Sequence, residues 1–141
     1  MTGPKISNQS DISNLFNSID GIEQGKTIDN VICRYPKIKR NFLFLVIQEY
    51  YRNYENFNHI LLNYIHNKTP KKTSRLLKIS LTLIFFSKKP HHAIVNDAVE
   101  ASKKLKNEKF VNAVLRNILQ ATDVEEIKMD FIGLQVEWMI A

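Results

Sequence analysis

The cysteine and histidine side chains are the residues of this sequence that could act as nucleophiles, bases or metal ligands. Cys33 is the only cysteine, which excludes an internal disulfide and a zinc site built from cysteines. No histidine lies near it in the sequence to support a reactive thiolate, so we interpret it as a structural thiol. His59 and His66 are too far apart for a helical ligand pair at i and i+4. His91 and His92 are adjacent and would point apart on a helix. These spacings predict no catalytic site, no metal and no cofactor.

Basic side chains are distributed unevenly along the 141 residues, whose net charge is +6. Residues 34–121 hold 17 Lys and Arg against five acids, a net charge of +12, whereas residues 1–33 carry −2 and residues 122–141 carry −4. No acidic residue lies between Glu55 and Asp97. A field of one sign on a folded domain suits a polyanion such as a nucleic acid. A lysine-rich solvated surface is the alternative explanation of the same charge.

Apolar residues recur at helical spacing along most of the chain, and no convincing alternating strand pattern is present. We expect Asp11 to cap a first helix, and Thr69 to cap a later one whose first helical residue is Pro70. A turn is expected at 53–58. The helices are expected at 12–22, 28–32, 38–51, 60–65, 70–86, 92–105 and 108–119.

The helix at 70–86 is apolar almost all round its C-terminal half, so we expect it in the middle of the core. In the helix at 108–119, Phe110 is expected to face inward with Val111 and Val114. The sequence therefore predicts an all-α protein with six or seven helices. Residues 1–121 would form one domain, and residues 122–141 an acidic tail that could be a docking helix, an edge strand or a frayed end.

The segment from Lys89 to Leu119 carries a family resemblance and reads KPHHAIVNDAVEASKKLKNEKFVNAVLRNIL. It resembles the signature of the NusB-type domain, which has a proline, a helix of the form Ala-x-x-Asn-Asp/Glu-Ala-Val-Glu-x-x-Lys, a short gap, and Phe-Val-Asn-x-Val-Leu. The wording FVNAVLR is closer to the N-terminal domains of the RsmB-type methyltransferases, which modify cytosine C5 in small-subunit ribosomal RNA. The resemblance implies a compact NusB-like helical bundle that binds RNA.

Three polar residues of this signature are expected to have a structural role before any functional one. Asn112 lies between the apolar residues Val111 and Val114, where a buried amide would need backbone partners and would fix the packing of the last two helices. Asn96 and Asp97 are expected to act similarly at the start of their helix, or to bind loop amides.

The regional charge and the resemblance together indicate three groups of RNA-contacting side chains. The first opens the helix at 38–51, the second surrounds the start of the helix at 70–86, where free amides also attract phosphate, and the third precedes FVNAVLR. Such contacts confer affinity and salt sensitivity without reading the RNA sequence. The first group is Lys37, Lys39 and Arg40, the second is Lys68, Lys71, Lys72 and Arg75, and the third is Lys103, Lys104, Lys106 and Lys109.

Two features of the sequence depart from the related proteins. NusB antitermination factors carry an arginine-rich first helix, whereas the first helix here contains Asp11, Asp20 and Glu23 and no arginine. The methyltransferases continue into a catalytic domain, but this chain has no glycine-rich cofactor loop and no Pro-Cys pair. We therefore expect a protein that is not itself an enzyme.

Three hypotheses for the function follow. The first is an RNA-binding domain acting on ribosomal RNA, as the non-catalytic module of a cytosine-C5 methyltransferase or as a free-standing relative. The second is a NusB-like antitermination factor that binds RNA together with a small-subunit ribosomal protein. The third is a helical protein-interaction or dimerisation domain without RNA, whose tail packs on a partner or a second copy. A cytoplasmic location without a membrane partner is expected, because no apolar run approaches the ~20 residues of a spanning helix and the N-terminus has no export signal.

Overall fold

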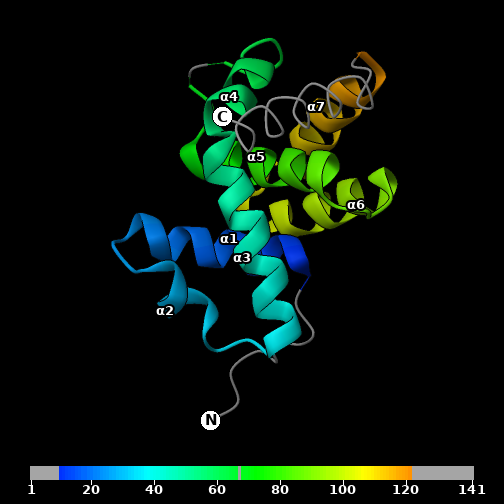
Figure 1. Ribbon diagram of the computed structural model, residues 1–141. Coiled ribbons are helices and arrows are strands. Elements are labelled where there is room, and N and C mark those ends of the chain that lie inside the picture. The colour runs from blue at the N-terminus through cyan, green and yellow to red at the C-terminus, as the bar shows by residue number, and fades with distance from the viewer. Residues whose placement is uncertain (1–9, 67, 122–141) are drawn as a thin grey trace, which may run out of the picture.

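The computed structural model describes residues 10–66 and 68–121, so the predicted tail at 122–141 lies outside the described residues. Within these ranges all regular structure is helical, which confirms the all-α prediction. None of the helices described has both the length and the apolar character of a membrane span. The elements shown in Figure 1 are α1 (Asp11–Glu23), α2 (Ile28–Ile32), α3 (Lys37–Arg52), α4 (Tyr54–Leu61), α5 (Lys71–Phe86), α6 (His91–Ser102), the 3₁₀ helix η2 (Lys103–Leu105) and α7 (Glu108–Ala121).

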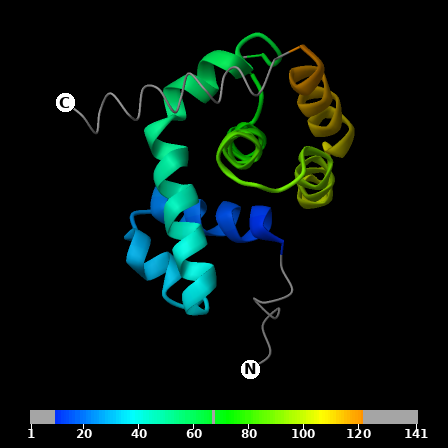
Figure 2. The same cartoon turned by 45° about the vertical axis from the view of Figure 1, so that its right-hand side comes forward.

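Helix α5 occupies the centre of the bundle, as its apolar sequence predicts. Every residue from Leu76 to Phe85 is buried. Ser80 and Thr82 lie within this stretch, and each hydroxyl donates to the carbonyl four residues earlier, which satisfies it without solvent. Helices α1, α3, α4, α6 and α7 all pack against α5, which Figure 2 shows nearly end-on with the other helices around it. Side chains of α5 can therefore lie next to side chains from several other helices.

Helix α1 begins one residue earlier than expected, because Ser10 is its cap. The Ser10 hydroxyl accepts a hydrogen bond from the Ser13 amide at 3.1 Å, so the predicted cap at Asp11 is wrong. Asp11 lies in the first turn instead, where its charge suits the helix dipole. Ile12, Leu15 and Ile19 are fully buried at helical spacing.

Two glycines, one in the connection and one near the end of α1, allow α2 to pack against α1. Gly25 has φ +101°, a left-handed conformation that favours glycine. Gly21 is buried, and a Cβ atom there would lie 2.7 Å from Cγ1 of Val31, so only glycine lets α2 approach α1 this closely.

The turn predicted at 53–58 is wrong, since these residues belong mainly to α4. Asn53, Asn56 and Asn58 favour a turn by their local preferences. Phe57 overrides them: it is fully buried, and its ring stacks on that of Phe85 with a centroid distance of 5.9 Å. Tertiary burial thus decides the conformation of this polar segment.

The starts of α5 and α7 also differ from the predictions. Pro70 is the residue that precedes the first turn of α5 and is not its first helical residue, and no side chain caps this end. Phe110 is 39% exposed, so the prediction that it faces inward is wrong, whereas Val111 and Val114 are buried as expected.

Candidate nucleic-acid interface

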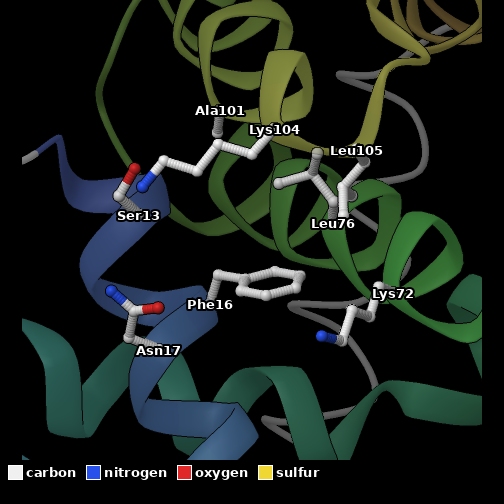
Figure 3. Close-up of a pocket in the computed structure, with 8 residues that line it drawn as sticks. All are labelled: Ser13, Phe16, Asn17, Lys72, Leu76, Ala101, Lys104 and Leu105. Atoms are coloured by element: carbon white, nitrogen blue, oxygen red, sulfur yellow. The ribbon is translucent and has the colours of Figure 1, made fainter.

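A groove of about 320 Å³ lies where α1, α5, α6 and η2 meet (Figure 3), and we call it the lysine groove. Helix α1 supplies one wall and α5 the other, while the end of α6 and η2, which directly follows it, complete the lining. Its lining residues are Ser13, Phe16, Asn17, Lys72, Leu76, Ala101, Lys104 and Leu105.

The lysine groove combines an aromatic ring with two ammonium groups. Phe16 is half-buried, and the Arg75 guanidinium lies over its ring, 5.5 Å from the centroid. In Figure 3 the side chains of Lys72 and Lys104 line the same groove, with the ammonium end of Lys104 beside Ser13. Both lysines are exposed, and neither ammonium group has an ion pair or a hydrogen bond to the described residues. An aromatic ring can stack on a base, and unpaired lysines can neutralise phosphates. This arrangement therefore suits a strand of nucleic acid.

A hydrogen bond attaches the third predicted basic group to α5. The Asn107 side-chain amide donates to the hydroxyl of Thr73 at 2.5 Å, and Thr73 is buried one residue after Lys72. Just before Asn107, Lys106 takes the left-handed conformation with φ +58°, which turns the chain from η2 into α7. The connection that carries Lys104 is thus held against the helix that carries Lys72.

The structure brings together only part of the predicted set. Lys72 of the second group and Lys104 of the third line the lysine groove. Lys71 and Arg75 line a different pocket, bounded by α3 and α4. The other members do not line the lysine groove: Lys68, Lys106, Lys109 and Lys37 are exposed elsewhere, and Arg40 is half-buried at the start of α3.

Three predicted contact residues are already held by carboxylates of the chain. Lys39 pairs with Asp11 at 2.7 Å, Arg75 with Asp20 at 2.7 Å, and Lys103 with Glu100 at 2.9 Å. The first two pairs join residues 28 and 55 positions apart, which local sequence could not indicate. A carboxylate neighbour lowers the attraction of each cation for phosphate.

Asp11 is the centre of the most connected of these ion-pair networks. Besides Lys39 it pairs with Lys89, which precedes α6, so three separate segments meet at one carboxylate. Burial works to raise the pKa of Asp11, but the hydrogen bonds and charges of Lys39 and Lys89 outweigh it and hold the pKa below its usual value. Asp11 therefore joins α1 to α3 and to the segment before α6.

Comparison with known proteins agrees with this helical arrangement. The family model described as the NusB family matches residues 11–120, which is most of the chain. The chain belongs to the NusB family. Membership indicates an RNA-binding helical domain, in line with the resemblance carried by residues 89–119. A comparison with curated proteins gives no match.

In this NusB-family domain, sequence reasoning missed the contribution of α1 to the groove. Ser13, Phe16 and Asn17 recur at i, i+3 and i+4, which places them on one face of the helix. The spacing was visible in the sequence. Phe16 fits the apolar stripe of a core helix equally well, however, so the spacing alone could not assign it to a groove.

The three signature polar residues of the NusB-family domain have modest contacts. Asn112 is half-buried, and its side-chain oxygen accepts from Arg116 Nε at 2.8 Å, one turn along the same helix. Asn96 is exposed and Asp97 half-buried on α6. Their structural role stays a prediction.

The described part of the NusB-family domain holds no group of three His, Cys, Asp or Glu side chains that could bind a metal ion. Cys33 is exposed, and its thiol donates to the carbonyl of Asn30 at 3.3 Å.

Proposed function

We propose that this chain binds ribosomal RNA through the lysine groove, as the non-catalytic module of a cytosine-C5 methyltransferase or as a free-standing relative in the cytoplasm. The observation that carries the proposal is that Phe16 lines one groove with Lys72 and Lys104, two lysines without an ion pair in the described residues. The family match and the sequence FVNAVLR support it. Residues 1–121 are the RNA-binding domain in this proposal.

The groove would hold a short stretch of single-stranded RNA. One base stacks on the Phe16 ring, and the neighbouring phosphates contact Lys72 and Lys104. The Asn17 amide lies in the same wall and offers both a donor and an acceptor to a base edge. In this proposal any methyl transfer belongs to a separate catalytic domain.

The test compares two double variants with the same change in charge. Lys72→Glu with Lys104→Glu removes both cations of the groove, whereas Lys26→Glu with Lys88→Glu changes exposed lysines outside it. In fluorescence titrations with unstructured RNA, we expect the groove variant to bind at least about tenfold more weakly, with a salt slope lower by about two. Equal losses in both variants would overturn the assignment to the groove.

The antitermination hypothesis has a separate readout. Co-purification with a small-subunit ribosomal protein, and RNA affinity that rises when that protein is added, would favour it over the methyltransferase module. A dimer that binds no RNA at low salt would favour the interaction-domain hypothesis.

A further inference from the structure

A second pocket, of about 440 Å³, lies against the N-terminal half of α5 and is bounded by α1, α3 and α4. We call it the Lys78 pocket. Lys71, Arg75 and Lys78 enter it from α5, at the i, i+4 and i+7 spacing that places side chains on one helix face. The other lining residues are Glu23, Tyr50, Tyr54, Thr69 and Ser74.

Lys78 is the unusual residue of this pocket. Only 5% of the residue is exposed, and its ammonium nitrogen lies 3.9 Å from the centroid of the Tyr54 ring. Among the described residues its ammonium group has no carboxylate partner and no hydrogen bond. Covering an ammonium without a counter-ion is costly, and one ring contact offsets only part of that cost. The Lys78 ammonium lines the pocket and is therefore placed to meet an anion that enters it.

The remaining walls add donors around Lys78. Arg75 uses one nitrogen for Asp20, and its guanidinium has further N–H groups. Ser74 and Thr69 bring hydroxyl groups near the first turn of α5, where helix amides are unpaired. Burial raises the pKa of Tyr50, so its phenol stays a neutral donor.

A single carboxylate, that of Glu23, lies in the same pocket. The Tyr51 hydroxyl donates to it at 3.4 Å, and burial followed by the nearby Glu23 charge raises the pKa of Tyr51 to about 12, so this donor also stays protonated. Lys71, Arg75 and Lys78 stand against Glu23 and the Asp20 carboxylate that pairs with Arg75. One positive charge remains, which attracts an anion such as a phosphate monoester.

We propose that the Lys78 pocket binds a phosphate monoester, with the phosphate on Lys71, Arg75 and Lys78 and the attached nucleoside against Tyr50 and Tyr54. The volume lies within the range of small-molecule sites, which begins near ~300 Å³. The same chemistry is offered by a free nucleoside monophosphate and by the terminal phosphate of an RNA strand. This site lies beside the lysine groove, and the two meet where the Arg75 guanidinium lies over the Phe16 ring, 5.5 Å from its centroid.

The test titrates the full chain with adenosine monophosphate, inorganic phosphate and adenosine at constant ionic strength, by calorimetry and by thermal unfolding. Adenosine monophosphate should bind saturably and raise the unfolding temperature. Adenosine should not. Lys78→Met should weaken binding at least about tenfold, while Lys88→Gln, at an exposed lysine outside the pocket, should leave it unchanged. Below pH ~6, where the monoester takes up a proton, affinity should fall.

The proposal would be overturned if Lys78→Met bound adenosine monophosphate as tightly as the wild-type chain does. It would also be overturned if the wild-type chain bound adenosine as tightly as adenosine monophosphate. Without ligand, Lys78→Met should be as stable as the wild type or more so, because an uncompensated buried charge is removed. If that variant does not fold, Lys71→Gln, at the exposed end of the same face, must weaken binding instead.

Two RNA strands that differ only in a terminal phosphate distinguish the sources. Tighter binding of the phosphorylated strand, lost in Lys78→Met, assigns the pocket to an RNA end. Equal binding of both strands, together with saturable binding of the monophosphate, assigns it to a free nucleotide. The Lys72→Glu, Lys104→Glu variant should keep its monophosphate affinity, so a failure of the groove proposal would not be mistaken for a failure of this one.

Discussion

The lysine groove and the Lys78 pocket use the same turns of α5 in different ways. In the groove, Lys72 and Lys104 are exposed and can follow a flexible polyanion. In the pocket, Lys78 is almost completely covered, and its neighbours come from α1, α3 and α4. Salt easily screens the attraction between exposed cations and an anionic ligand. A covered cation is screened less, because little water reaches it, and its pocket admits only anions of suitable charge and size. Two kinds of anion recognition can therefore share one helix.

The largest expected effect concerns the helix that supports both sites. Leu77 is fully buried on α5. Leu77→Ala should lower the free energy of unfolding by about 2–5 kcal/mol, because it leaves a cavity in the helix that supports both sites. Leu62→Ala, at a leucine that is 62% exposed, should change it by less than about 0.5 kcal/mol. Chemical denaturation measures both; similar values for the two variants would contradict the central role of α5.

A smaller effect separates the two sites. Phe16→Ala removes the ring of the lysine groove and should weaken RNA binding by about 1–3 kcal/mol. The affinity for adenosine monophosphate should fall less, because this change removes only the ring beneath the Arg75 guanidinium and leaves Arg75 in place. Phe110→Ala, at an aromatic residue that is also partly exposed but lies outside the groove, is the matched control. If Phe16→Ala weakened the binding of RNA and of adenosine monophosphate equally, the groove and the pocket would not be distinct sites.

The smallest effect concerns α1, which supplies Phe16 to the groove and Glu23 to the pocket. Asp11→Asn removes the pairs with Lys39 and Lys89 and should cost about 1 kcal/mol of stability near neutral pH. Because folding lowers the pKa of Asp11, this stabilisation is present above its ordinary value of 3.8 and is lost as the pH falls through the lower folded value.

The wild-type chain and Asp11→Asn should therefore become equally stable in acid. Denaturation of both between neutral and acidic pH measures the difference. Asp29→Asn, at an exposed acid of α2, serves as the control. A difference that persists in strong acid would exclude the ion pairs as its cause.

The helices could be predicted from the sequence because their apolar residues recur at helical spacing, as in α5 and α7. Helix α4 could not, since its asparagines favour a turn and only the burial of Phe57 against Phe85 decides otherwise. The same division holds for the sites. Local charge identified Lys72 and Lys104, but not that Asp20 holds Arg75 across 55 residues or that the covered Lys78 faces a pocket.

The contact of Gly21 with Val31 has a consequence for the motions of the chain. A helix of five residues, such as α2, does not persist by itself in water, so its hydrogen bonds last only while it stays docked on α1. The segment from Gly25 to Pro36 should consequently open and close as one cooperative unit, ahead of global unfolding. A single methyl group at position 21 would shift that local equilibrium towards the open form, while the hydrogen-exchange protection of α5 remained that of the intact bundle.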